Sequence, residues 1–324
     1  MAKYVAHAHS KIILSSHKVR KDIVSIASKL GYLSFESDEQ NNFDQNIEQM
    51  RRDDVLLFPF PSGKGREQDD LAFLTKIKEK QVKLILITLN IDYLRYDTAD
   101  KAATVSALQQ ADVLITLSQA MNQQLLLDGV NVPMVVLDLH DYLSEGEILP
   151  ATYMKKLIFA GSPYKATYMQ GWQSHIPIDI FAREEAIEHI DQLHDSISYT
   201  GYLTPDKMPN LINYGFGLAF DVDSDAGHFA NYQTLNLSHK VSLFLAAGLP
   251  IIVNARAASA PMLRAANAAL VIDSIGDIED IFYAMDDVQY HKLAHGSAQL
   301  GRLVRDGFFY TKAVRQAEQL IDVE

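Results

Sequence analysis

The sequence contains no cysteine, which excludes disulfide bonds and thiolate metal sites and fits a reducing cytoplasm. It also has no excess of basic residues, because it contains 29 Lys and Arg and 41 Asp and Glu, which gives a formal net charge of −12. A chain of this charge repels anionic membranes and the phosphate backbone of nucleic acids. We therefore expect no nucleic-acid partner, although a single nucleotide needs only a local pocket.

Long hydrophobic runs are missing as well. No apolar run approaches the roughly 20 residues that span a bilayer, and the N-terminal stretch MAKYVAHAHSKIILSS has no continuous hydrophobic region of the signal-peptide kind. We expect a cytoplasmic protein with no transmembrane segment. Its 324 residues exceed a typical single domain, so two domains are the natural expectation.

Several familiar motifs are absent. The sequence has neither a Walker A pattern nor G-x-G-x-x-G nor G-x-S-x-G, which removes the main support for a P-loop ATPase, an ordinary NAD dehydrogenase or a typical serine hydrolase. The run Asp221-Val-Asp223-Ser-Asp225 begins like a calcium loop, but Ala226 and Tyr232 occupy the positions that require Gly and Glu. We expect these aspartates to end a strand and to border a cleft, without a metal ion.

The first half of the chain alternates apolar strands with amphipathic helices. Strands are expected at Tyr4–His7, Leu33–Glu36, Val55–Phe60, Leu84–Leu89, Val113–Leu117 and Met134–Leu139. Helices are expected at Lys18–Leu30, Gln68–Lys80, Thr98–Ala111 with a threonine cap, and Gln119–Leu127 capped by Ser118. Fully apolar strands between helices are typical of a parallel sheet covered on both faces. We therefore expect a Rossmann-like N-terminal domain over residues 1–150.

The same alternation restarts after an acidic, loop-like stretch at residues 140–153. Strands are expected at Leu157–Ala160, Ile178–Phe181, Ile197–Tyr199, Phe216–Val222, Ile251–Val253 and Ala269–Ile272, with helices at Pro261–Ala266 and Ile278–Met285 and a short one opened by Thr204-Pro205. This predicts a second Rossmann-like domain over residues 151–305. The helical tail, residues 306–324, is expected to pack back on the first domain.

The stretch Asn231–Asn254 reads as a capped helix, a stop and a buried strand. Asn236 or Ser238 can cap the helix, one face of the helix is apolar, and Gly248 ends it. Lys240 stands in the first turn, where the helix dipole disfavours a cation by roughly 0.3–1 kcal/mol. A bound anion would reverse that effect, because a helix N-terminus with a lysine is a ready phosphate site. The alternative is an ordinary solvated lysine.

This stretch resembles the signature of the glucosyltransferase 3-like bacterial sugar transferases. Further segments agree with that family in order and spacing, namely residues 111–115 (ADVLI), 157–161 (LIFAG), 199–206 (YTGYLTPD) and 215–218 (GFGL). A helix followed by AAGLPIIV is also similar to GT-B glycosyltransferases in general, where it borders the nucleotide-sugar diphosphate. The resemblance covers most of the chain and is densest in its second half.

The resemblance implies an α/β enzyme of the GT-B fold, with two Rossmann-like domains facing each other across a nucleotide-sugar cleft and without a metal or other cofactor. Family members take a UDP-sugar, extend the O-linked N-acetylglucosamine (GlcNAc) on serine-rich repeat adhesins beside the accessory secretion system, and tend to form homotetramers. Whether glucose or GlcNAc is donated, which linkage forms and whether the anomeric configuration is retained stay open. The alternatives are a catalytically silent GT-B-like subunit that binds the adhesin or a partner enzyme, and a GT-B-type UDP-sugar epimerase.

Site residues follow from the same resemblance. It implies that Lys240 faces the diphosphate, that residues 199–203 border the uracil, and that the loop over residues 10–16 approaches the donor, although this loop is poorer in glycine than the family pattern. The residues expected to bind the donor are Ser16, Ser162, Lys165, Tyr199, Tyr202, Leu203, Asn231, Tyr232, Asn236, His239, Lys240 and Ser242.

For catalysis, Lys240 and the helix N-terminus would stabilise the charge that develops on the departing UDP. An acceptor hydroxyl can also need a general base. Asp92 is the candidate from its position just after an apolar strand, and His140 is a second, although an ordinary loop role fits His140 better.

Overall fold

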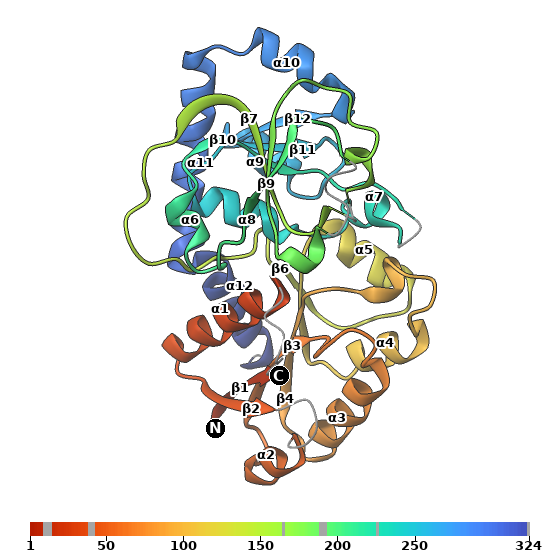
Figure 1. Cartoon of the computed structure of the whole chain (residues 1–324). Coiled ribbons are helices and arrows are strands. Elements are labelled where there is room, and N and C mark those ends of the chain that lie inside the picture. Colours follow the sequence, from red (N-terminus) through yellow and green to blue (C-terminus); the bar gives the residue numbers. More distant parts are fainter. Residues whose placement is uncertain (9–14, 38–42, 164–165, 188–192, 225–226, 323–324) are drawn as a thin grey trace. The chain divides into compact units, whose positions relative to one another are not determined.

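A computed structural model describes residues 1–8, 15–37, 43–163, 166–187, 193–224 and 227–322. The chain divides into two compact units, one made of Met1–His140 with Gly307–Glu324 and the other of Asp141–Asp306. Each unit contains a sheet of six strands, shown in Figure 1. None of the helices in the described part of the chain is both long and apolar enough to cross a membrane.

The first unit is a doubly wound parallel sheet with the strand order β2-β1-β3-β4-β5-β6. Its strands are β1 (Lys3–Ala8), β2 (Leu33–Ser37), β3 (Val55–Phe60), β4 (Lys83–Thr88), β5 (Val113–Thr116) and β6 (Met134–Val136). Its helices are α1 (Ser15–Lys29), α2 (Phe43–Gln49), α3 (Glu67–Glu79), α4 (Lys101–Leu108), α5 (Gln119–Leu127) and α12 (Phe308–Asp322). Figure 1 shows α1 and α12 on one face of this sheet and α3 and α4 on the other.

The core of the first unit lies along its central strands. All residues of β3 and β5 are buried, as expected for parallel strands covered on both faces. Helix α12 adds Tyr310, Val314 and Ala317, all buried, to the face formed by β5 and β6. The chain turns into α12 at Gly307, whose φ of 76° is left-handed.

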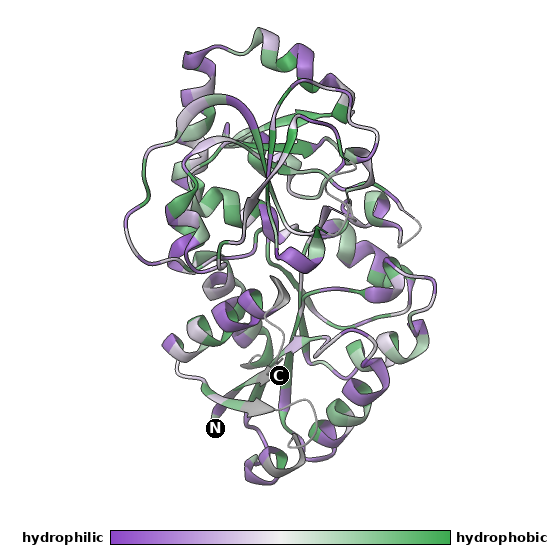
Figure 2. Cartoon of the chain, in the orientation of Figure 1, coloured by the Kyte–Doolittle hydropathy of each residue, from purple (hydrophilic) through white to green (hydrophobic). Residues whose placement is uncertain are grey.

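The second unit has the strand order β12-β11-β10-β7-β8-β9, again with parallel pairs throughout. Its strands are β7 (Thr152–Ala160), β8 (Ile178–Phe181), β9 (Ile197–Gly201), β10 (Tyr214–Ala219), β11 (Ile251–Asn254) and β12 (Ala269–Ile272). Its helices are α6 (Met208–Leu211), α7 (Phe229–Tyr232), α8 (His239–Ala246), α9 (Ala260–Ala265), α10 (Ile278–Ala284) and α11 (Asp287–Asp306). Figure 2 shows hydrophobic residues on the central strands of this sheet. Trp172 is buried in the hydrophobic cluster to which these strands contribute.

Helix α8 lies between the sheet and α11. The ring of Phe244 packs on Gly217 of β10, and the carbonyl of Leu245 lies against Gly301 of α11. All residues from Val241 to Ala246 are therefore buried. The sequence predicted one apolar face on this helix, but the structure buries more than one face, because α8 is covered on both sides.

Several predicted elements are confirmed by the structure, including the bounds of β3, β8, β12 and α5. The cap of α5 is also confirmed, since the Ser118 hydroxyl accepts a hydrogen bond from the Met121 amide at 3.1 Å. The predicted start of α4 at Thr98 is wrong. Asp100 is the N-cap, and its carboxylate accepts from the Ala103 amide at 2.9 Å.

Two further helix starts differ from the prediction. Thr204-Pro205 does not open a helix, because the Thr204 carbonyl closes a turn with the amides of Lys207 and Met208 before α6 begins. Helix α1 begins at Ser15, three residues before the predicted start at Lys18. Helix α2 was not predicted, because its sequence FDQNIEQ has too few apolar residues to show a helical period.

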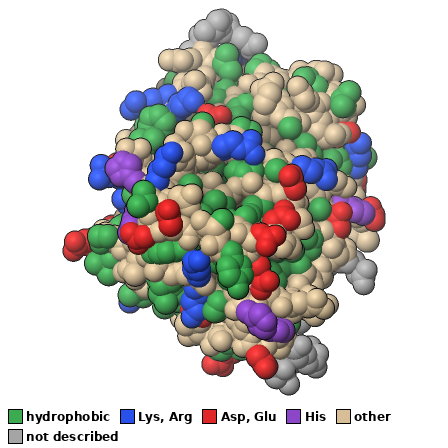
Figure 3. All heavy atoms as spheres, turned by 90° about the horizontal axis from the view of Figure 1, so that it is seen from above, with side chains coloured by type: hydrophobic (Ala, Val, Ile, Leu, Met, Phe, Trp, Pro, Cys, Tyr) green, Lys and Arg blue, Asp and Glu red, His purple; other side chains and the backbone are tan. Residues whose placement is uncertain are grey.

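On the face shown in Figure 3, basic and acidic side chains are interspersed. The net charge of −12 is therefore not gathered into a single patch on that face.

Candidate active site

Lys240 stands over the point in the second unit where the strand order reverses, between β7 and β10. Open α/β sheets bind ligands outside the carboxyl ends of the strands at such a point. Lys240 lies in the first turn of α8, and its Nζ is 5.0 Å from the ring centroid of Phe159 in β7. The same Nζ is 3.0 Å from Oδ1 of Asp221, two residues beyond β10.

Asp221 gives Lys240 a counter-charge within the chain. The two side chains are 23% and 27% exposed, so the pair is partly solvated and contributes about 0–1 kcal/mol. The sequence left two explanations open for a cation in the first turn, a bound anion and a solvated lysine. The structure adds a carboxylate of the protein that faces the ammonium, and the anion stays a prediction. Such a weak pair can give way to a more highly charged anion.

The first turn of α8 has no side-chain cap. Ser238 occupies the N-cap position, but its hydroxyl makes no capping hydrogen bond, and α8 begins too late for Asn236 to cap it. The predicted capping bond is therefore wrong. The oxygen Oδ1 of Asn236 is instead buried in a small pocket beside Asp221. The side chain of Ser238 therefore does not supply the hydroxyl cap that often satisfies the start of a helix.

Two arginines occupy positions like that of Asp221. Arg183 lies two residues beyond β8, and its guanidinium carbon is 5.5 Å from the ring centroid of Tyr202. Arg256 lies two residues beyond β11, and its Nη2 is 3.3 Å from Oδ1 of Asn231. Both were missed by sequence reasoning. The available signal was a polar residue just after each apolar strand, which places it at the carboxyl edge of the sheet.

The residues expected around the uracil lie at the end of β9. The Tyr199 hydroxyl donates to the carbonyl oxygen of Ala182 at 3.2 Å, which holds it against the neighbouring strand end. Tyr202 follows β9 directly and is 43% exposed, with Arg183 beside its ring. Leu203 is half-buried. This end of β9 therefore offers an exposed aromatic face next to a cation.

The other predicted donor contacts separate into accessible and buried side chains. Asn231 is exposed, and His239 stacks on Tyr142 with ring centroids 4.8 Å apart. Tyr232 and Ser242 are buried in the second unit.

Three predicted residues lie near the described boundaries or beyond them. Ser162 is half-buried, two residues beyond β7. Lys165 lies outside the described residues. Ser16 belongs to α1, and its side chain is outside the description.

Both candidate bases belong to the first unit. Asp92 begins a short 3-10 helix (Asp92–Leu94) after β4, is buried, and pairs with Nη1 of Arg95 at 3.2 Å. Nδ1 of His140 lies 2.6 Å from the Tyr310 hydroxyl, and both side chains are buried. His140 thus links the end of the first stretch of this unit to α12.

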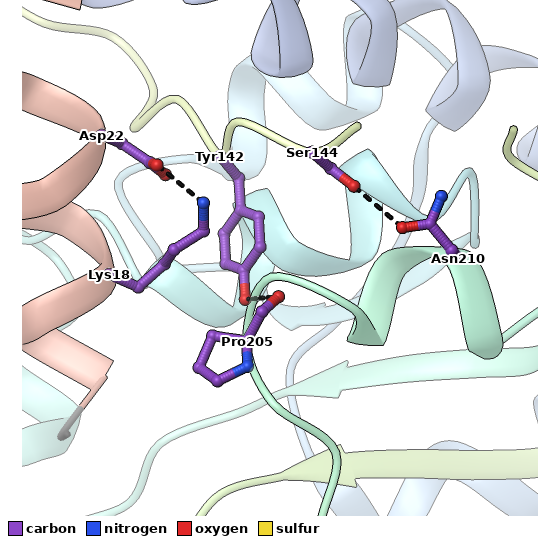
Figure 4. A network of polar contacts seen from close by, with 6 residues as sticks. All are labelled: Lys18, Asp22, Tyr142, Ser144, Pro205 and Asn210. Carbon is purple, nitrogen blue, oxygen red and sulfur yellow. Dashed lines mark hydrogen bonds and ion pairs between the residues drawn. The ribbon is translucent and has the colours of Figure 1, made fainter. Parts of the chain in front are cut away.

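Figure 4 shows further polar contacts that fix local structure within each unit. In the first unit, Nζ of Lys18 lies 2.6 Å from Oδ1 of Asp22, one helical turn along α1, and both side chains are buried. In the second unit, the Tyr142 hydroxyl donates to the carbonyl of Pro205 at 2.9 Å, and the Ser144 hydroxyl donates to Oδ1 of Asn210 at 3.1 Å. The second set ties the segment before β7 to the region around α6.

Two aspartates of the run after β10 have partners within the second unit. Asp223 accepts a hydrogen bond from the Ala230 amide at 2.8 Å, while Asp221 pairs with Lys240, and Asp225 lies outside the described residues. Among the residues that the structure describes, no group of three or more His, Asp and Glu side chains could hold a metal ion.

Comparison with known families decides the family of the chain. The profile "Glucosyltransferase 3-like, N-terminal domain" matches residues 4–139, and "Glucosyltransferase 3-like, C-terminal domain" matches residues 157–317. The chain belongs to the glucosyltransferase 3-like family. The predicted family is confirmed, and the protein is a glycosyltransferase.

Curated relatives of this glucosyltransferase 3-like chain cover nearly its whole length. Glucosyltransferase 3 of Streptococcus gordonii is 26% identical over 313 residues, covering 92% of each chain. Glucosyltransferase 3 of Streptococcus parasanguinis is 24% identical, covering 98% of each chain.

Solved structures confirm the predicted GT-B fold. HepE of Anabaena in complex with UDP matches with a TM-score of 0.65 at 9% identity, covering 99% of this chain and 100% of HepE. Sucrose-phosphate synthase of Thermosynechococcus elongatus matches with a TM-score of 0.62 at 9% identity and the same coverage. At such low identity these similarities concern the fold alone.

Proposed function

We propose that this glucosyltransferase 3-like protein transfers a hexose or N-acetylhexosamine from a UDP-sugar to O-linked GlcNAc on a serine-rich repeat adhesin. The observation that carries the donor proposal is the position of Lys240 over the reversal point of the second sheet. Arg183 and Arg256 follow two other strands at the same edge. Three cations there, in a chain of net charge −12, suit a nucleoside diphosphate. The structural relative HepE is known with UDP and with UDP-glucose.

In this proposal Lys240 exchanges its partner when the donor binds. The ammonium leaves Asp221 for the diphosphate, and the leading N–H groups of α8 point at the same oxygens. The exchange costs little, because the ion pair is partly exposed. When the glycosidic bond breaks, the new charge on UDP develops beside these preorganised groups. Arg183 and Arg256 would neutralise charge further along the strand ends, so the reaction needs no metal ion.

The exposed ring of Tyr202 is the proposed neighbour of the uracil, because it stands at the end of β9 with Arg183 beside it. Asp92 is the proposed general base for the acceptor hydroxyl, and Arg95 orients its carboxylate. Membership of the glucosyltransferase 3-like family supports the glycosylated adhesin as acceptor, a cytoplasmic location and a homotetrameric assembly as parts of the same proposal.

Calorimetry with UDP, UDP-glucose and UDP-GlcNAc tests the proposal, followed by sugar transfer to a GlcNAc-modified serine-rich peptide in buffer with EDTA. We expect binding and EDTA-resistant transfer. Lys240→Ala should weaken UDP binding about 10- to 100-fold, because a charge-assisted hydrogen bond is worth roughly 1.5–3 kcal/mol. Lys155→Ala, an exposed lysine on β7 of the same unit, is the matched control and should bind normally.

Two results would contradict the proposal. Transfer at the wild-type rate by the Lys240→Ala variant would remove this lysine from the site. Failure of the wild-type chain to bind any of the three nucleotides would remove the donor assignment itself.

A further inference from the structure

A small pocket lies beside the Lys240–Asp221 pair in the second unit, and we call it the oxygen-lined pocket. It is lined by Ala219, Asp221, Gln233, Asn236, Ser238, Val241, Ala257 and Ser259. Its free space holds about one water-sized group. It therefore accepts a single polar group and not a whole sugar ring or an acetamido group.

The pocket brings the acceptor oxygens of Asn236 and Asp221 beside the hydroxyls of Ser238 and Ser259, which can donate or accept. Oδ1 of Asn236 is buried and receives no hydrogen bond from any described residue. The amide nitrogen of Gln233 already donates to the carbonyl oxygens of Asp221 and Ala230, at 2.9 and 3.2 Å. Nζ of Lys240 donates to Asp221. Within the described part of the chain the Asn236 oxygen thus has no donor, and a buried acceptor without one costs free energy.

This pattern of atoms limits the ligand group. A phosphate oxygen cannot donate a hydrogen bond to Asn236 at neutral pH, and a carboxylate would meet the like charge of Asp221. A hydroxyl group satisfies both conditions, because it donates, carries no charge and has the size of the free space. The proposed function, on which this step rests, supplies such a group, since the transferred sugar is bonded directly to the phosphate that Lys240 would hold.

We propose that the oxygen-lined pocket binds one hydroxyl group of the transferred sugar through Asn236, and that Asp221 beside it selects neutral sugars against uronic acids. Asp221 then has two functions, as resting partner of Lys240 and as a specificity residue. A site that hydrogen-bonds a substrate hydroxyl discriminates strongly, because a donor without that hydroxyl leaves the buried acceptor unpaired. The carboxylate adds repulsion of the wrong donor to attraction of the right one.

Asn236→Ala separates recognition of the sugar from recognition of the nucleotide. The measurement is the affinity for UDP and for the UDP-sugar that the wild-type chain binds more tightly. We expect UDP to bind within twofold of wild type and the UDP-sugar to bind at least tenfold more weakly. Asn210→Ala, which removes an amide side chain near α6 in the same unit, is the control and should change neither affinity.

Asp221→Asn tests the charge selection with UDP-glucuronate and UDP-glucose. We expect the wild-type chain to prefer UDP-glucose by at least tenfold and the variant to lose most of that preference. Any effect of freeing Lys240 from its carboxylate acts on both nucleotides and cancels in the ratio.

The inference is overturned if Asn236→Ala weakens UDP and UDP-sugar equally, or leaves the UDP-sugar affinity unchanged. It is also overturned if Asp221→Asn keeps the full preference for UDP-glucose. In each of these cases wild-type binding of UDP would leave the proposed function standing. A wild-type chain that binds no UDP would overturn both.

Discussion

At the scale of single residues, two lysine–carboxylate pairs of similar chemistry differ in how deeply they are buried. Lys240 and Asp221 are 23% and 27% exposed, whereas Lys18 and Asp22 are 4% and 3% exposed. Water compensates a charge that leaves a partly exposed pair, so Lys240 can exchange its partner. A buried pair cannot separate without leaving an uncompensated charge, which makes Lys18 and Asp22 part of the permanent structure of α1.

Asp70 is the residue from which we expect a pH effect. Burial raises the pKa of Asp70 to about 6, although the Ser62 amide and the charges of Arg20 and Arg66 lower it. Because the folded-state pKa lies above the unfolded value of about 3.9, the protonated carboxyl stabilises the fold below about pH 4. That stabilisation is lost as the pH rises through about 6.

The free energy of unfolding of wild type minus that of Asp70→Asn should therefore fall between pH 4 and pH 6 and level off above. The fall is on the order of 2–3 kcal/mol, at 1.36 kcal/mol for each pKa unit, and thermal melts at each pH measure it. Asp69→Asn changes an exposed carboxylate in the same turn of α3 and serves as control. A difference that stays constant from pH 4 to pH 7 would contradict the pKa assignment.

At the scale of elements, close packing fixes α8 and the first turn that carries Lys240. Phe244 occupies the space over Gly217, where a Cβ atom would overlap its ring. On the other side, Nη1 of Arg305 in α11 donates to the last carbonyl of α8, that of Ala246, at 2.6 Å. A helix held on both sides presents its N-terminus in one orientation, which the proposed stabilisation of the departing UDP requires.

Gly301→Ala tests this packing. Alanine in a helix is normally favoured over glycine by roughly 0.5–1 kcal/mol, which alone would raise the melting temperature. At Gly301, however, a Cβ atom would overlap the carbonyl oxygen of Leu245, and overpacking costs about 1–3 kcal/mol. We expect a lower melting temperature in calorimetry. Gly171→Ala has free space around the new methyl group and should be neutral. A variant at Gly301 that melts at or above wild type would refute the close approach of α8 and α11.

At the scale of the whole molecule, the last helix belongs to the same unit as the first strand. Removing residues 307–324 would expose the face of β5 and β6 and take away the buried side chains of Tyr310, Val314 and Ala317. We expect the first unit to melt at a lower temperature or to aggregate. UDP affinity, assigned to the second unit, should stay within a few-fold of wild type. A chain ending at Asp322 is the control. Unchanged melting of the longer truncation would show that α12 is dispensable.

The sequence predicts well where local rules are sufficient. Strands such as β3 and β8 are continuous apolar runs because both faces are covered, and Ser118 caps α5 from its own neighbourhood. Lys240 stood out through a local rule as well, the unfavourable charge in a first helical turn.

Tertiary information was needed for the rest of the site. The ion pair of Lys240 with Asp221 depends on the packing of α8 against β10. The contact of Lys240 with Phe159 depends on β7 and β10 being neighbours, and strand order is not written in any short stretch of sequence. For the same reason Arg183 and Arg256 were not predicted, because only the strand order shows that they lie at the same edge of the second sheet. The burial of Ser242 was not predicted either, since it follows from the covering of α8 by α11.

The division of the chain has a consequence for its synthesis. The first unit is made of Met1–His140 and Gly307–Glu324, so the whole second unit is inserted between its two parts. A ribosome delivers all of residues 141–306 before α12 exists. The face of β5 and β6 in the first unit therefore stays uncovered until α12 is synthesised, whereas the second unit can already bury its own core. The first unit is synthesised first but can complete its folding only after the second unit has been made. Until then its uncovered apolar face is the surface that a nascent-chain chaperone would bind.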